Sequence, residues 1–199
     1  MNERMRRALI ALFFALQLST AQGRAAPVHY VLEPHRSSVV FVLHMLGNAQ
    51  LHMHFRNVGA ELDQAPETGE MPRVAVTIDA RSVAASTPFT AHIAKGRALL
   101  DTQHYPEIRF SSTRFVRTGL DSGLLTGDLT IRAETKPVTL AVTFEHPIRA
   151  EGERATSLAV SARGHFSRAA FGLVGWAGTV GDDVEMTIRA RFVQMAPGQ

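Results

Sequence analysis

Apolar and polar residues alternate most regularly between Leu124 and Phe144. This two-residue period predicts two strands, each with one apolar and one polar face. The segment from Ala133 to Pro137 interrupts the alternation and is predicted to be a polar loop of about five residues. Proline cannot donate a ladder hydrogen bond, so Pro137 is expected in the turn or at the start of the second strand. The pattern therefore predicts a long antiparallel hairpin.

The same alternation recurs along the rest of the chain. Further strands are predicted near residues 28–32, 38–46, 51–56, 60–62, 74–79, 108–116, 158–166 and 184–192, with a bulge at Gly59. About eight of these strands are long and joined in sequence by turns, which predicts an all-β antiparallel sheet. Closing that sheet into a barrel removes its edge strands, so a barrel is expected, with a two-sheet sandwich as the alternative.

One segment predicts a helix, from Thr87 to Leu100. Ser86 or Thr87 is a suitable N-cap, Pro88 fits the first turn, and Phe89 and Ile93 fall on one face. Because the remaining pattern is all β, this helix is expected on the outside of the sheet or as a lid.

The N-terminal segment has the pattern of an export signal. Three arginines within residues 1–7 precede an apolar run from Ala8 to Leu18, and small residues follow. Cleavage is expected after Ala21 or Ala25, and residues 26–199 are expected to form a single exported domain. An uncleaved anchor is the alternative, although the run is short for a membrane span.

Removing residues 1–25 changes the charge of the protein. That segment carries a net charge of +3, which is also the net charge of the whole chain, so the exported part is near neutral. The basic pI therefore gives no support for nucleic-acid binding. The chain contains no cysteine, which excludes disulfides, iron–sulfur clusters and cysteine zinc sites.

Several ordered motifs resemble the YceI-like family of exported lipid-binding proteins. They include Val39–His44, the Gly127–Ile131 and Thr135–Val138 segments, Ser167-Arg168 with Phe171-Gly172, and Gly181–Val184. The resemblance covers about residues 28–192. It implies an eight-stranded antiparallel, lipocalin-like barrel with one short helix, whose apolar interior holds an isoprenoid lipid such as an isoprenoid quinone or a prenyl phosphate.

Motif position and alternation together select the candidate ligand-binding residues. They are Phe41, His44, Phe55, His92, Phe110, Leu129, Arg168, Phe171 and Trp176. Small residues at inward positions, Ala162, Gly164 and Ala190, would leave room inside the barrel. An interior filled by side chains is the competing interpretation, because small barrels are either filled or hold one ligand.

Three histidines suggest an alternative function. His52 and His54 share a strand face and His44 lies across a turn, so the three could bind a transition metal in a β-barrel enzyme. The spacing fits a cupin signature poorly, and no hydrolase motif occurs. The favoured interpretation is a non-enzymatic periplasmic lipid carrier with no cofactor. Transient membrane contact and a homodimer are compatible with that role.

Overall fold

The computed structural model describes residues 28–64, 72–145 and 156–195. The predicted signal peptide, residues 1–25, lies outside them. The described strands are β1 (Val28–Leu32), β2 (Ser38–Met45), β3 (Gln50–Phe55), β4 (Val58–Gln64), β5 (Arg73–Asp79), β6 (Val83–Ala84), β7 (Glu107–Arg117), β8 (Ser122–Ile131), β9 (Glu134–Phe144), β10 (Ser157–Ser167) and β11 (Val180–Gln194). Helix α2 is Pro88–Lys95, and short 3₁₀ turns are η1 (Pro34–Arg36), η2 (Leu46–Asn48), η3 (Ala80–Ser82) and η4 (Ala169–Phe171).

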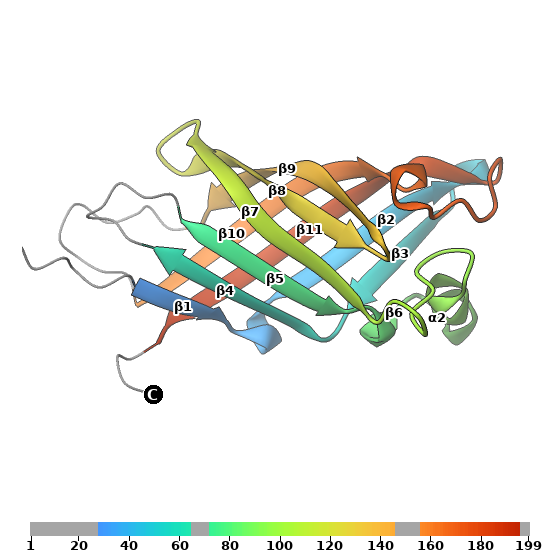
Figure 1. Ribbon diagram of the computed structural model, residues 1–199, viewed down its shortest axis with the longest axis horizontal. Coiled ribbons are helices and arrows are strands. Elements are labelled where there is room, and N and C mark those ends of the chain that lie inside the picture. The colour runs from blue at the N-terminus through green and yellow to red at the C-terminus, as the bar shows by residue number, and fades with distance from the viewer. Residues whose placement is uncertain (1–27, 65–71, 146–155, 196–199) are drawn as a thin grey trace, which may run out of the picture.

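These segments form a closed antiparallel barrel of eight strands (Figure 1). Three of the eight barrel strands are interrupted, so each of them has two labels: β1 with β2, β3 with β4, and β5 with β6. The long strand β11 pairs with β2 along its first part and with β1 at its end, where Tyr30 opposes Gln194. The β1–β11 pairing closes the sheet on itself, which confirms the predicted barrel and excludes the sandwich.

The interruption between β3 and β4 falls at Arg56 and Asn57, two residues before the predicted bulge at Gly59. Ser82, from η3, compensates for the broken ladder. Its Oγ accepts hydrogen bonds from the backbone N–H groups of Arg56 (3.1 Å) and Asn57 (3.0 Å). Gly59 itself lies inside β4, opposite Thr77.

The predicted hairpin is formed by β8 and β9, but its connection is shorter than expected. Only Arg132 and Ala133 join the strands, and Arg132 takes a positive φ of 56°. Pro137 lies inside β9, opposite Asp128. The ladder between β9 and β10 begins only at Leu140. No strand is paired with β9 on that side at Pro137, so its missing N–H interrupts no ladder.

Helix α2 is shorter than the predicted Thr87–Leu100 segment. Thr87 caps it and forms a reciprocal capping box with Thr90. The helix ends at Lys95, and the residues that follow form turns in which Leu99 and Leu100 are almost completely buried. Together, α2 and residues 96–100 lie at the end of the barrel opposite the start of β1 and the end of β11 (Figure 1).

Candidate functional site: the barrel interior

Strand register decides which side chains point into the barrel. On β10 and β11, opposed pairs such as Phe166–Val184 and Ala162–Ile188 point inward, while the intervening arginines point outward. The inward residues form two apolar clusters. The larger includes the α2 end and extends along β9 and β10 to Val142 and Ala162, and the smaller consists of Val28, Tyr30, Ala60, Leu62 and Phe192 from β1, β4 and β11.

Aromatic rings pack the α2 end closely. Phe55, Phe41, Phe166 and Phe171 form a chain of edge-to-face contacts, with ring centroids 5.0, 5.5 and 5.2 Å apart in that order. Such geometry is favourable for aromatic pairs, and each ring is nearly buried. This end of the interior is therefore filled by side chains.

The rest of the interior is different. Inward-facing apolar residues on five strands remain only partly buried: Val76, Leu125, Phe144, Val160 and Ile188. Their smaller neighbour Ala190 is also partly exposed. Because these side chains point inward, their exposed area borders the interior. Protein cores are normally close-packed, so the partial exposure of these residues indicates that side chains do not fill this half of the barrel completely.

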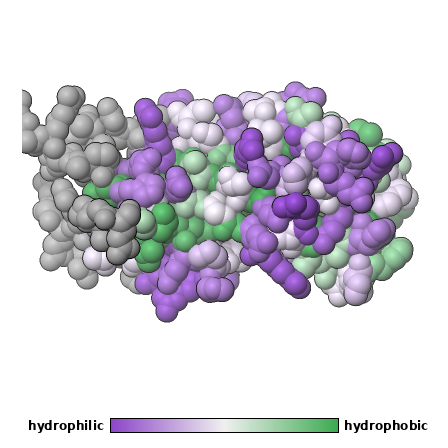
Figure 2. All heavy atoms as spheres, turned by 60° about the horizontal axis from the view of Figure 1, so that its bottom comes forward, coloured by the Kyte–Doolittle hydropathy of each residue, from purple (hydrophilic) through white to green (hydrophobic). Residues whose placement is uncertain are grey.

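The half of the molecule away from α2 also has apolar residues on its surface. Figure 2 shows a strip of hydrophobic surface between hydrophilic residues in the half of the molecule away from α2. Inside this half of the barrel, Phe115 on β7 and Phe144 on β9 meet edge to face, with ring centroids 6.2 Å apart. Phe115 reaches its inward position because a register shift between Ser112 and Arg114 reverses the alternation of β7. The sequence predicts a bulge in this strand between Phe110 and Phe115, and the register shift confirms it.

Comparisons with known proteins agree on one family. The model of the YceI-like domain matches residues 30–192. The chain belongs to the YceI-like family. A UPF0312 protein of Pseudomonas putida (strain W619) is 32% identical over 138 residues, which are 69% of this chain and 71% of that protein. The protein YceI of Escherichia coli is 31% identical over 137 residues, covering 68% of this chain and 71% of the relative.

Solved structures show the same YceI-like fold. BcnA of Burkholderia cenocepacia superposes with a TM-score of 0.69 at 21% identity, covering 80% of this chain and 98% of BcnA. A protein from Saccharophagus degradans, described as a polyisoprenoid binding domain implicated in plant cell wall breakdown, gives 0.65 at 12% identity and covers 83% and 98%. At these identities the likeness establishes the fold.

Five of the predicted ligand residues lie inside the YceI-like barrel. Phe41, Phe55 and Phe171 belong to the packed aromatic chain at the α2 end, linked by Phe166, which the prediction missed. Phe110 and Leu129 oppose each other on β7 and β8. Contact of these five with a ligand stays a prediction, and Phe166 shares the alternation that selected them.

Arg168, predicted to meet a polar ligand group, is buried in the connection between β10 and β11. Its guanidinium donates to the backbone carbonyls of Gly181 (2.7 Å), Gly175 (2.8 Å), Val180 (2.9 Å) and Leu173. A buried cation needs such partners. In this structure the arginine organises the loop, and a ligand role stays a prediction that would require giving up some of these bonds.

The other polar candidates lie on the surface. His44, His52 and His54 share the outer face of β2 and β3, where Gln50 hydrogen-bonds both His44 (3.4 Å) and His52 (3.1 Å). Among the described residues, no group of three metal-ligating side chains has the geometry of a metal site. His92 and Trp176 are exposed on α2 and on the β10–β11 loop. The strand register therefore places His44, His52 and His54 on the outside of the barrel.

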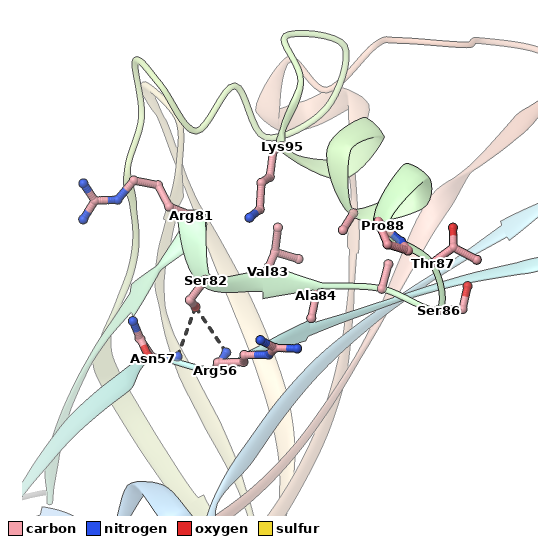
Figure 3. Close-up of a pocket in the computed structure, with 12 residues that line it drawn as sticks. Arg56, Asn57, Arg81, Ser82, Val83, Ala84, Ser86, Thr87, Pro88 and Lys95 are labelled. Atoms are coloured by element: carbon pink, nitrogen blue, oxygen red, sulfur yellow. Dashed lines mark hydrogen bonds between the residues drawn. The ribbon is translucent and has the colours of Figure 1, made fainter.

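A groove of about 480 Å³ lies outside the barrel, beside β6 and α2 (Figure 3). Its charged lining residues are Arg56, Arg81 and Lys95. Arg81 is engaged with Asp79, Nε to Oδ1 at 2.9 Å, and this hydrogen bond holds the pKa of Asp79 below its ordinary value. In Figure 3 the Arg81 side chain points away from Lys95 and Arg56. No helix in the described part of the chain is long and apolar enough to cross a bilayer.

Proposed function

We propose that this protein binds a long isoprenoid lipid inside its barrel and carries or sequesters it in the periplasm. The observation that carries the proposal is the set of inward apolar residues on β5, β8, β9, β10 and β11 that remain partly exposed. An isoprenoid chain would cover this surface. Burial of apolar area contributes about 25 cal/mol per Å², so an enclosed chain needs few polar contacts.

Family membership supports the same ligand class. The Saccharophagus degradans relative is described as a polyisoprenoid binding domain, and it shares this fold. The polar head, either a quinone ring or a phosphate, would lie outside the apolar space. The mechanism is equilibrium binding: the protein lowers the free energy of a water-insoluble chain without changing its bonds.

Organic extraction of protein purified without detergent, followed by mass spectrometry, tests the proposal. Protein exported to the periplasm of a host that makes isoprenoid lipids should release a prenyl chain in near-stoichiometric amount. Recovery of the protein from the periplasmic fraction tests the location in the same preparation. An empty extract from correctly exported protein would count against the carrier function.

A matched pair of variants then locates the lipid. Ala190 points inward on β11 and Arg189, its neighbour, points outward. Ala190→Phe adds a ring to the unfilled interior and should reduce the extracted lipid several-fold, whereas Arg189→Phe should leave it unchanged. Equal lipid content in the two variants would place the lipid elsewhere.

A further inference from the structure

The α2 end of the barrel presents large apolar side chains to solvent. Leu46 on η2, Phe89 on α2, and Val174 and Trp176 on the β10–β11 loop have exposed fractions between 45% for Trp176 and 71% for Phe89. These four residues are called the apolar tip. Backbone hydrogen bonds join the three segments: Leu46 N–H to Thr179 O (3.0 Å) and Gly175 N–H to Ala98 O (3.1 Å). Clustered exposed apolar residues mark an interaction surface.

The backbone holds Trp176 outward in an unusual conformation. Its φ is +54°, although glycines stand nearby in the same loop. The Trp176 carbonyl accepts hydrogen bonds from the N–H groups of Thr179 (3.0 Å) and Val180 (3.1 Å), which fixes the turn. A left-handed conformation in a bulky residue costs energy and is concentrated at functional sites.

The segments that carry the apolar tip contain charges of one sign only. The connections at residues 45–50, 83–100 and 168–181 contain no Asp or Glu, and apart from the buried Arg168 their charges are the exposed Arg97 and the half-buried Lys95. The flanking acids are engaged: Asp101 pairs with His104 (2.9 Å), and Asp182 accepts the Ala169 N–H (2.9 Å). The groove of Figure 3 adds Arg56 opposite Lys95, with no acidic side chain in its lining.

From these observations we infer that the α2 end is a docking surface for an anionic phospholipid bilayer. The apolar tip enters the headgroup–acyl boundary, where Trp and Phe are favoured. Lys95, Arg97 and Arg56 meet headgroup phosphates, and the groove between Arg56 and Lys95 has room for one. A second copy of the same surface fits less well, because a two-fold contact would bring the cations of both copies together.

The inference concerns how the protein meets a membrane and does not depend on what the barrel holds. In the docked orientation, α2 and residues 96–100, which cover one end of the barrel, lie against the bilayer. The surface on the opposite end, which includes the 86% exposed Leu120 of the β7–β8 turn, faces away from it.

Trp176 is the single tryptophan of the chain and therefore reports docking directly. We expect its emission to shift to the blue with vesicles of phosphatidylethanolamine and phosphatidylglycerol, and to be quenched by brominated acyl chains. Pure phosphatidylcholine vesicles should bind much more weakly, and salt should weaken binding to the anionic vesicles.

Variants separate the two components of the surface. Phe89→Ser should lower the vesicle partition coefficient about tenfold, and Lys95→Glu with Arg97→Glu should remove the preference for anionic vesicles. The matched control is Leu120→Ser, which removes an even more exposed apolar residue from the opposite end and should change nothing.

Three outcomes would overturn the inference. They are equal effects of Phe89→Ser and Leu120→Ser, binding of inorganic phosphate by the groove without vesicle binding, and a blue shift that follows protein concentration together with dimer formation in light scattering. Measuring lipid-extracted and untreated protein side by side separates docking from lipid content, so failure of one proposal leaves the other standing.

Discussion

The Phe110 ring on β7 occupies the space that a side chain at Gly127 on β8 would fill. A Cβ at Gly127 would stand 2.4 Å from the ring's Cζ and 2.5 Å from the Ser111 carbonyl oxygen. Phe115 has the same relationship to Gly123, where the distance to its Cζ is also 2.4 Å. Both rings thus lie over backbone instead of over side chains, which keeps them close to the barrel wall. The glycines of β8 are therefore part of what shapes the interior.

Gly127→Ala tests this relationship. The added methyl group must displace both the Phe110 ring and the β7 backbone, so we expect a loss of about 2 kcal/mol in the free energy of unfolding. Urea denaturation measures the loss. Gly59→Ala on β4 is the matched control, because its Cβ would meet nothing closer than 4.0 Å, and should stay within about 0.5 kcal/mol of the wild type. Equal stability of the two variants would show that the ring and backbone adjust freely.

Arg168→Met tests whether the buried arginine holds the β10–β11 loop. The substitution keeps the apolar stem but leaves four backbone carbonyls without their donors, so a loss of about 3 kcal/mol is expected. The exposed Arg189→Met should change stability by less than about 0.5 kcal/mol. Unchanged stability combined with loss of extracted lipid would instead support the predicted ligand role of Arg168.

The alternation of apolar and polar residues is enough to predict the barrel, its antiparallel order and most strands, because each barrel strand has one buried and one solvated face. It failed where local geometry changes the period. The sequence predicts a longer β8–β9 connection because Pro137 is expected in the turn or at the start of the second strand, yet β9 continues through Pro137, where it has no β10 partner. The helix was predicted to be longer because Leu99 and Leu100 continue an apolar pattern that the structure uses in buried turns.

The interior was only partly predictable. Inward faces identified Phe41, Phe55, Phe110 and Leu129, but sequence does not say which inward residues pack against one another and which border unfilled space. That difference depends on contacts between distant strands, such as Phe41 on Phe166. Arg168 shows a second limit: a motif marks the residue, while only the folded loop shows that its donors face carbonyls.

Metal removal should leave the protein unchanged if the outer-face histidines have no metal role. Treatment with EDTA is expected to alter neither the melting temperature nor the extracted lipid. His52→Ala should behave like the wild type in both respects, since His52 is exposed and its ring hydrogen-bonds the exposed Gln50 side chain. Elemental analysis provides the opposing result: near-stoichiometric transition metal that disappears in His52→Ala would revive the metalloenzyme alternative.

Asp182 should make stability depend on pH in acid. A hydrogen bond from the Ser167 side chain, and then one from the Ala169 N–H, lower the pKa of Asp182 below its ordinary value. A carboxyl group whose pKa is lower in the folded state stabilises the fold above its unfolded pKa of about 3.9, and this contribution is lost as the pH falls through the folded value. Asp182→Asn keeps an acceptor oxygen but removes the charge. We therefore expect the variant to melt at a lower temperature than the wild type at pH 7, with the difference shrinking below about pH 4. Thermal melts followed by circular dichroism between pH 2.5 and 7 measure the difference, and a gap that stays constant or widens in acid would contradict the assignment.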